Sequence, residues 1–311
     1  MTTVSAGELP LASIELLRYP RTRHLQGSRL QDGDSSDFQP LATIAGAHAV
    51  IEEKLDGANS AVSFSPGGQL LLQSRGHYLM GGARERQFAL LHRWAAAHEE
   101  WLLERLEDRY VMYGEWLFSK HSCFYDQLPG YFHEFDVWDR NEQRFLSTRR
   151  RAALLEGGPV VQVPVLYEGG MPGEPRLLAG LVRPALGKSP AWKESFERAV
   201  RRLGLPLELC WQQTDREDAA EGLYVKLEDE DQVLGRYKFV RPSFTQTILD
   251  SGSHHASRPI VPNELAPGFD PFAPQPALTW KDLGLTTLRD LDALRLATVA
   301  PNAPRRRRDR G

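Results

Sequence analysis

Hydrophobic and polar residues alternate in several short runs along the chain, and this period of two predicts β-strands. The clearest pair of strands lies in residues 50–64, where Val50 and Ile51 close one run and Val62 and Phe64 belong to the next. An Asp-Gly pair stands between them, which is typical of a hairpin turn. We therefore expect an antiparallel hairpin. Further strands are predicted at residues 69–74, 110–118, 131–138, 160–165, 221–227 and 233–240.

Helical spacing is found in three other stretches. Apolar residues recur at near-helical intervals through residues 85–106, which predicts one or two amphipathic helices. Ser147 before a basic and then apolar run predicts a capped helix start, and residues 192–203 predict another helix.

The density of prolines changes after residue 247 and suggests how the chain is divided. Six prolines fall between residues 250 and 277, which indicates an extended linker. We expect a main domain at residues 1–247, a Pro-rich linker at 248–277, a short helical appendage at 278–300 and a basic, disordered tail at 301–311.

Composition adds limits on the environment. Hydrophobic residues make up 41% of the 311 residues and charged residues 25%, as in ordinary soluble domains, and the net charge is −3. Cys123 and Cys210 fit neither a disulfide framework nor a zinc spacing, so we expect a reducing, cytoplasmic setting. We expect no signal peptide and no membrane span.

Lys54 stands where the first strand of the hairpin ends, two residues before Asp56. A lysine amine is a nucleophile only when neutral, so its pKa of about 10.4 must be lowered by burial or by nearby cations. An ordinary hairpin with an exposed lysine is the alternative, because Lys-x-Asp-Gly by itself is common.

Acids also occur in strands that are otherwise apolar. Glu115 interrupts an aromatic strand, and Glu134 and Asp136 alternate with Phe135 and Val137, so that the two acids share one face. A carboxylate in such a strand needs a partner or a cation. Carboxylate oxygens suit Mg²⁺ or Mn²⁺ and not zinc.

The chain has a series of charged and aromatic residues at or near the ends of predicted strands. This series resembles the motifs of the covalent nucleotidyltransferase superfamily, which comprises ATP-dependent DNA ligases, RNA ligases and mRNA capping enzymes. The RNA ligase family, in its RNA ligase 2-like branch, is the nearest likeness, over residues 50–242. The series is Lys54, Arg75, Glu115, Phe135, Glu221, Lys226 and Lys238.

This resemblance implies a fold and a nucleophile. The implied fold is α+β, an ATP-grasp-like adenylyltransferase domain of two antiparallel sheets flanking a nucleotide cleft, with outer helices and a small C-terminal appendage. Lys54 would attack the α-phosphate of ATP to form a lysyl-AMP, with Asp56 or Asn59 orienting it. Glu53 would help to recognise the adenine, and Phe135 would stack on it.

The resemblance also implies phosphate and metal ligands. Arg75 would contact the ribose or a 5′-phosphate, Glu115 the ribose or a metal-bound water, and Glu221 a Mg²⁺ or Mn²⁺ ion. Lys226 would contact the α-phosphate, and Lys238 would be the principal phosphate lysine of the last motif.

The final motif departs from the family's pattern. The family has Lys-x-Lys, whereas this chain offers Lys238 with Arg236 or Arg241 as a companion, and which arginine substitutes is left open. Further RNA contacts are expected from Arg29, His77 and Arg241.

The predicted function is an ATP-dependent RNA ligase of RNA repair, which joins 5′-phosphate and 3′-hydroxyl ends through a lysyl-AMP and an adenylated 5′ end. Nicked duplexes are among the candidate substrates, the basic tail could contact RNA phosphates, and we expect a monomer. A DNA ligase or a GTP-dependent capping enzyme is the first alternative. The roughly 70 residues after the last motif are Pro-rich and offer little material for the OB-fold of those enzymes. A non-catalytic nucleic-acid-binding protein on the same scaffold is the second alternative.

Overall fold

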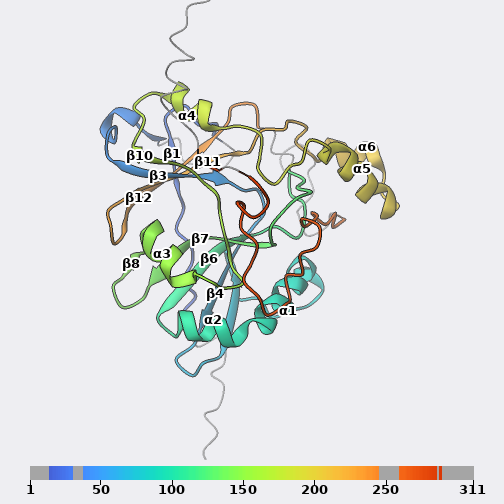
Figure 1. Cartoon of the computed structure of the whole chain (residues 1–311), viewed down its shortest axis with the longest axis horizontal. Coiled ribbons are helices and arrows are strands. Elements are labelled where there is room, and N and C mark those ends of the chain that lie inside the picture. Colours follow the sequence, from blue (N-terminus) through green and yellow to red (C-terminus); the bar gives the residue numbers. More distant parts are fainter. Residues whose placement is uncertain (1–13, 31–37, 245–258, 286, 289–311) are drawn as a thin grey trace, which may run out of the picture.

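Two β-sheets packed face to face form the body of the protein, with helices on the outside (Figure 1). The computed structural model describes residues 14–30, 38–244, 259–285 and 287–288. No helix in this described part is long and apolar enough to span a lipid bilayer.

The first sheet has six strands in the order β10-β3-β11-β12-β1-β2. The pairings β10-β3, β3-β11 and β11-β12 are antiparallel, and β1 pairs in parallel with both β12 and β2. The strands are β10 (Val165–Gly170), β3 (His48–Lys54), β11 (Gly222–Glu228), β12 (Val233–Val240), β1 (Arg23–Leu25) and β2 (Phe38–Gln39).

The second sheet follows the order β5-β4-β6-β7-β8 with antiparallel pairings, and a short sixth strand, β9, pairs with β7 in parallel. The strands are β5 (Leu70–Ser74), β4 (Ala58–Phe64), β6 (Tyr110–Trp116), β7 (Phe132–Asp139), β8 (Arg144–Phe145) and β9 (Val161–Gln162).

Helices cover the outer faces because each sheet has an apolar outer side. η3 (Ala83–Phe88), α1 (Ala89–Ala97) and α2 (Glu99–Leu106) lie below the second sheet, and α4 (Pro175–Leu181) lies above the first (Figure 1). α5 (Trp192–Arg202) and α6 (Leu207–Gln212) form a separate pair to one side. α3 (Thr148–Leu155) and η2 (Leu41–Thr43) complete the described helices.

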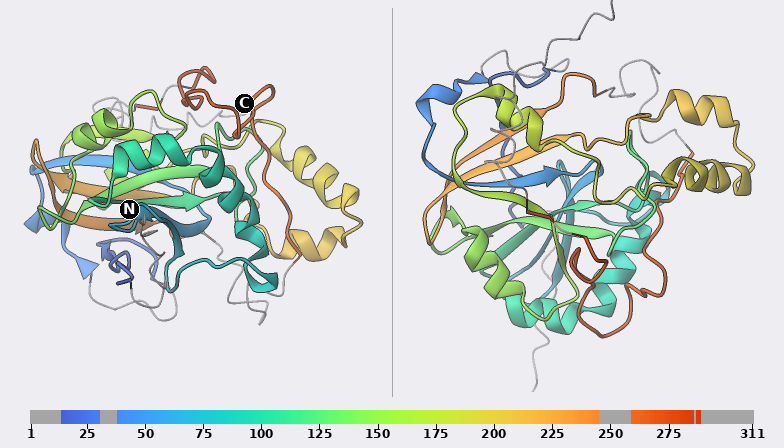
Figure 2. Two further views of the ribbon diagram at one scale, coloured as in Figure 1. Left: turned by 90° about the horizontal axis from the view of Figure 1, so that it is seen from below. Right: turned by 45° about the horizontal axis from the view of Figure 1, so that its top comes forward.

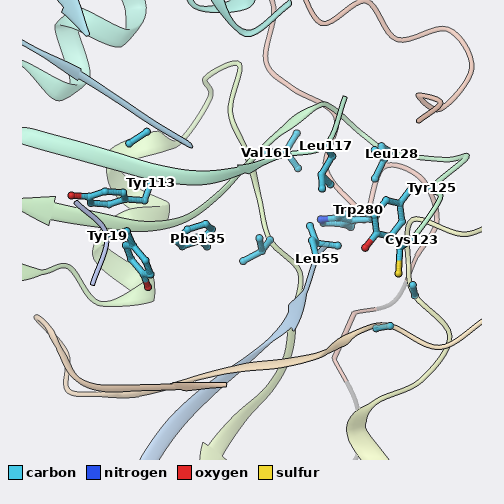
Figure 3. Packing of buried hydrophobic residues seen from close by; sticks show 14 of the residues in the cluster. Tyr19, Leu55, Tyr113, Leu117, Cys123, Tyr125, Leu128, Phe135, Val161 and Trp280 are labelled. Atoms are coloured by element: carbon cyan, nitrogen blue, oxygen red, sulfur yellow. The ribbon is translucent and has the colours of Figure 1, made fainter. Parts of the chain in front are cut away.

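A further cluster of buried apolar residues fills the space between the two sheets (Figure 3). Tyr19 meets the edge of the Phe135 ring there, with ring centroids 5.1 Å apart. Burying side chains of this size stabilises the fold by roughly 1.5–3 kcal/mol each. The cleft described below opens between the sheets toward one end of them.

The described part of the C-terminal segment runs along the outside of the body, as the red ribbon in Figure 2 shows. Val261, Asn263 and Trp280 from this segment are buried, and the Trp280 indole N–H donates to the carbonyl oxygen of Gln162. Residues 279–285 form turns. The division into a linker at 248–277 and an appendage at 278–300 stays a prediction, and the basic tail lies outside the described residues.

The predicted α+β fold of two sheets with outer helices is confirmed, and β12 has the predicted bounds. The predicted helix at residues 85–106 is a 3₁₀ turn followed by two α-helices. The Ser147 hydroxyl accepts a hydrogen bond from the amide of Arg150, as a helix cap should. The predicted strand at 160–165 is divided into β9 and the start of β10, because Pro164 cannot donate to a ladder.

The predicted alternation along β7 is wrong at one position. The register between β6 and β7 shifts, so that Asp136 faces Tyr113 and Glu134 faces Gly114 with Phe135 as the extra residue. As a result Phe135 belongs to the cluster between the two sheets, whereas Val137 belongs to the cluster between the second sheet and the helices α1 and α2. The two residues therefore do not share a face.

Candidate functional site

A cleft of about 810 Å³ opens between the two sheets, at the ends of β3, β4, β5 and β6 that meet there. Ten of the residues predicted from the sequence line it, although they are spread over nearly 190 positions of the chain. They are Glu53, Lys54, Asp56, Asn59, Arg75, His77, Glu115, Phe135, Glu221 and Lys238.

The turn between β3 and β4 is fixed by close packing. A Cβ atom on Gly57 would lie 2.6 Å from a methyl group of Leu117, so a side chain does not fit there. The Asp56 carboxylate accepts hydrogen bonds from the amides of Ser122 (2.6 Å) and Cys123 (2.7 Å). The geometry therefore makes Asp56 an anchor for the loop after β6, and its predicted role as a catalytic group on Lys54 has no contact to support it.

Lys54 is the last residue of β3, and its side chain is 23% exposed. Its Nζ atom lies 2.7 Å from Oε2 of Glu221. Burial alone would lower the pKa of Lys54, but attraction to Glu221 and Glu115 outweighs it and raises the pKa well above its usual range. Without a nucleotide or a metal, the amine is therefore held protonated and is not nucleophilic.

Glu115 and Glu221 are the two acids nearest this amine. Burial raises the pKa of each carboxyl to about 7, although Lys54 opposes the shift. The Glu115 carboxylate also accepts a hydrogen bond from the amide of Gly57 at 3.0 Å. Each acid is thus close to its titration midpoint at neutral pH.

These acids fit a divalent cation that is shared with a substrate. Nowhere in the described residues do three or more His, Cys, Asp or Glu side chains gather into a ready metal cage. Mg²⁺ is commonly bound by one or two carboxylates together with substrate phosphates. Glu115 and Glu221 supply that number of carboxylates and the hard oxygen donors that the ion prefers.

Two aromatic rings face each other at one end of the cleft. Phe135 of β7 and Tyr224 of β11 have ring centroids 6.0 Å apart and an interplanar angle of 29°. The Tyr224 hydroxyl is hydrogen-bonded to the Thr22 hydroxyl and lies 3.0 Å from the Tyr19 hydroxyl. Tyr19 donates in turn to Asp136 at 2.5 Å.

Tyr19, Thr22 and Tyr224 were missed as cleft residues by sequence reasoning. The alternation of β11 places Tyr224 on the same face as Lys226, and this signal could have marked it. Tyr19 and Thr22 precede the first long strand, in a segment without periodicity, so no local pattern points to them.

Glu53 lines the cleft, but its polar groups are already engaged. Its carboxylate accepts from the amide of Leu186, with both oxygens 3.2 Å from the nitrogen, and its own amide donates to Pro164. Its contribution to adenine recognition stays a prediction. In the nucleotide-free structure, its carboxylate supports the loop that contains Leu186.

Lys226 does not lie where the resemblance implied. Its side chain is fully buried, and it is absent from the described residues that line the cleft. Its Nζ atom lies 2.7 Å from Glu52 and 3.3 Å from Asp136, and it donates to the carbonyl oxygen of Phe135. In this structure Lys226 is therefore a buried cation that joins the two sheets, and its contact with the α-phosphate stays a prediction.

Arg151 extends this ion cluster and was missed as well. Its guanidinium is 1% exposed and pairs with Glu52 at 2.7 Å and Glu134 at 2.8 Å. The sequence places Arg151 in a run of three arginines, which suggests a solvated helix face. Only the packing of α3 against the sheets shows that one of the three points inward.

The remaining predicted residues lie around the rim. Asn59 on β4 stands opposite Glu115 on β6, and Lys238 lies on β12 opposite Tyr224. Arg75 and His77 follow β5 and are exposed. The His77 Nε2 atom lies 3.1 Å from Glu85, which limits how His77 can turn.

Two arginines that were predicted to contact RNA lie outside the described lining of the cleft. Arg241 is buried and pairs with Asp215 and Glu217, so its guanidinium is not presented to RNA in this structure. Arg29 is exposed and donates to the carbonyl oxygens of Pro242 and Phe244, and its RNA contact stays a prediction.

Arg236 also fails to reach the cleft as a companion of Lys238. Its guanidinium lies 4.0 Å from the centre of the Phe145 ring and 3.9 Å from Asp136. Neither Arg236 nor Arg241 is among the described residues that line the cleft, so neither stands there beside Lys238 in place of the second lysine of the family's Lys-x-Lys motif.

Comparison with known proteins bears on this site. The RNA ligase family profile matches residues 47–240, which is more than half of the chain. No curated protein matches. A Naegleria gruberi RNA ligase with PPi is 17% identical, with a TM-score of 0.45 over 74% of this chain and 62% of that one. A mutant of that ligase with ATP and Mn is 16% identical, with a TM-score of 0.43 over 71% and 59%.

The chain spans about three fifths of the length of these ligases. The assignment of the chain to a family rests on the family profile and not on these structures. The match extends from the start of β3 to the end of β12 and so includes the cleft residues of both sheets, Lys54, Glu115, Phe135, Glu221 and Lys238 among them. The chain belongs to the RNA ligase family.

Proposed function

We propose that this protein is an ATP-dependent RNA ligase that joins 5′-phosphate and 3′-hydroxyl ends through a covalent lysyl-AMP. One observation carries the proposal. The amine of Lys54 lies 2.7 Å from Glu221, with Glu115 beside them, in a cleft that ends at the facing rings of Phe135 and Tyr224. A base, a phosphate and an amine nucleophile could be held there in line.

The purine is proposed to lie against Phe135, with Tyr224 as the opposite wall. A base stacked on an aromatic side chain gains roughly 1–3 kcal/mol. Stacked carbon atoms lie about 3.5 Å apart, so a base between two rings requires roughly 7 Å between them. The two ring centroids are 6.0 Å apart, so the Tyr224 ring has to shift when the base enters.

The first chemical step forms a phosphorus–nitrogen bond between Lys54 and the α-phosphate and breaks the bond to pyrophosphate. The amine must first lose its proton, which the pair with Glu221 resists. A divalent cation on Glu115 and Glu221 would neutralise phosphate charge when bound. Lys54 freed from Glu221 would have a lower pKa, and Lys238 would hold a phosphate oxygen.

The later steps follow from the chemistry of the adduct. AMP passes from Lys54 to the 5′-phosphate of an RNA strand, and a 3′-hydroxyl then displaces AMP to form the phosphodiester. Arg75 and His77, exposed on the rim after β5, are proposed to meet the incoming strand end. Both cysteines are buried free thiols, in agreement with our proposal of a reducing, cytoplasmic setting. The proposed place of this activity is the repair of broken RNA.

Adduct formation tests the proposal most directly. The purified protein is treated with pyrophosphate and Mg²⁺ to remove any AMP already bound, desalted, incubated with ATP or GTP and Mg²⁺ or Mn²⁺, denatured, and weighed as an intact chain. We expect a mass gain of one AMP from ATP and none from GTP. Lys54→Ala should abolish the gain. Lys193→Ala, which changes a lysine that is 48% exposed, should not.

The outcomes separate the alternatives. A GMP adduct would favour a capping-type enzyme. The same adduct with ATP but sealing of DNA ends only would favour a DNA ligase. No adduct from folded, AMP-free protein would contradict the enzyme and favour a non-catalytic nucleic-acid-binding protein.

A further inference from the structure

A second, smaller cavity lies beside the nucleotide cleft. It is formed by η3, the loop after β6, α6 and residues 259–261. Gln87 and His121 line both the cavity and the cleft, so the two spaces adjoin at these side chains. The His121 Nε2 atom lies 3.5 Å from the Gln87 side-chain oxygen, so the two shared side chains are in contact with each other.

The chemistry of the cavity differs from that of the cleft. Six acids line the cleft, whereas none of the described residues that line the cavity is acidic. Arg86, Lys120 and His121 contribute basic groups to the cavity wall, and Leu209 and Pro206 of the α6 region contribute apolar surface. A basic wall beside apolar atoms suits the sugar-phosphate backbone of a nucleic acid.

Lys120 and Arg86 have different roles in this wall. Lys120 donates to the carbonyl oxygens of His121 (2.8 Å) and Gln213 (2.5 Å), so it ties the loop after β6 to the end of α6. Arg86 is exposed, at the edge of the cavity. Arg86 is therefore the cation that a ligand can recruit without dismantling the fold.

The size of the cavity limits what it can hold. Its volume of about 80 Å³ is that of two or three water molecules, each of which takes about 30 Å³ in the liquid. A phosphate group fits such a space, but a whole nucleotide does not.

The position of the cavity indicates which molecule brings this phosphate. In the second sheet, Phe135 lies on β7, and β6 and β4 separate it from β5. η3 lies on the β5 side, because Glu85 contacts His77. The base of ATP is proposed to occupy the Phe135 side, so a strand end that reaches Lys54 has to approach from the β5 side.

We propose that this cavity is a phosphate subsite for the RNA strand whose 5′ end receives AMP. It would hold a backbone phosphate near that end, with Arg86 as the principal cation and the apolar surface of Leu209 against the ribose. This inference depends on the proposed ligase function for the identity of the strand, and it adds a substrate contact outside the nucleotide cleft.

Two variants test the subsite. Arg86→Ala removes the cation, and Leu209→Glu places a negative charge at the wall from a side chain that is 45% exposed. Leu203→Glu is a matched control, because Leu203 is 43% exposed and is not a described residue of the cavity. Arg149→Ala is the control for Arg86, because its side chain is 71% exposed on α3.

Three quantities are measured for each protein. Formation of the AMP adduct should be unchanged in both test variants, because that step needs no RNA. Transfer of AMP to a 5′-phosphorylated oligoribonucleotide should fall by roughly tenfold in kcat/KM, as expected for one lost charged contact. In Arg86→Ala, the dependence of oligonucleotide binding on log salt should lose a slope of about one.

The result that overturns the subsite is transfer and salt slope equal to those of the controls while the adduct forms. A defect confined to sealing of a pre-adenylated strand would also overturn it, since the contact would then belong to the 3′-hydroxyl strand. If the wild type forms no adduct, the ligase proposal fails separately. Fluorescence anisotropy of the same oligonucleotide then decides on the cavity, and equal affinity of variants and controls counts against it.

Discussion

The Nζ atom of Lys54 lies 2.7 Å from Oε2 of Glu221, and this pair keeps the proposed nucleophile charged in the nucleotide-free protein. The same carboxylate is a proposed metal ligand. Activation of the amine and binding of a cation therefore compete for one side chain. Three of the following predictions test groups that lie directly around this pair or around the rings beside it.

The stability of the metal-free protein should fall as pH rises through neutrality because of Glu115 and Glu221. Burial raises their folded-state pKa values to about 7 from the ordinary 4.5. A group whose pKa is raised by folding contributes stability that is complete below its unfolded pKa and is lost as pH rises through the folded value. Thermal unfolding between pH 5 and 8, without divalent ions, measures this loss.

The double variant Glu115→Gln/Glu221→Gln provides the control for this pH dependence. Its melting temperature should vary less over the same range, because two titrating carboxyls are gone. Adding Mg²⁺ should stabilise the wild type more at pH 8 than at pH 5.5, since the ion needs ionised carboxylates. Equal pH dependence in the wild type and the double variant would show that these acids do not titrate near 7.

Tyr224 should contribute to nucleotide binding through its ring. Tyr224→Ala removes the wall opposite Phe135 and should raise the KM for ATP in adduct formation by roughly five- to 100-fold, the value of one stacking contact. Tyr224→Phe keeps the ring and loses only the hydrogen bonds to Thr22 and Tyr19, so its KM should stay much closer to the wild type. Equal KM values for Ala and Phe would exclude the ring as a wall of the base site.

Asp56 should stabilise the loop after β6 and should not act as a base. Asp56→Asn weakens the hydrogen bonds to the amides of Ser122 and Cys123, which are charge-assisted in the wild type. We expect a loss of roughly 1–3 kcal/mol in unfolding free energy by urea titration. The pH dependence of adduct formation should keep its shape in the folded variant. A shift of that profile would instead indicate a direct part in proton transfer.

The sequence alone predicted the elements whose signals are local. The Lys54 hairpin and β12 follow from alternation and turn chemistry over a few residues. The series of residues at predicted strand ends then predicted much of the lining of the cleft. This worked because strands that end on one side of two packed sheets place their last residues around one space.

Features that depend on distant partners could not be predicted in this way. The bulge at Phe135 is set by pairing with β6, and alternation in β7 alone gave the wrong face. Alternation correctly placed Lys226 on the same face as Tyr224. It could not show that Glu52 and Asp136 lie across from Lys226, because these acids come from other strands.

The role of Lys226 can be tested by removing its charge together with that of a partner. Lys226→Met removes the cation that Glu52 and Asp136 share, although Arg151 still pairs with Glu52 and Arg236 still lies 3.9 Å from Asp136. Breaking a buried ion pair from one side costs roughly 3–5 kcal/mol, and chemical denaturation should show this loss. Glu52→Gln/Lys226→Met also removes the charge of one of the two acids that lost Lys226, and it should recover a large part of the lost stability.

Adduct formation in the same two variants separates support of the sheets from phosphate contact. If Lys226 only positions the carbonyl group of Phe135, it affects ATP binding through the fold. The double variant should then regain adduct formation as it regains stability. A lysine that contacts the α-phosphate directly would leave the double variant stable and inactive, with kcat and not KM reduced. That second pattern would return Lys226 to the phosphate site and would require the buried ion cluster to open when ATP binds.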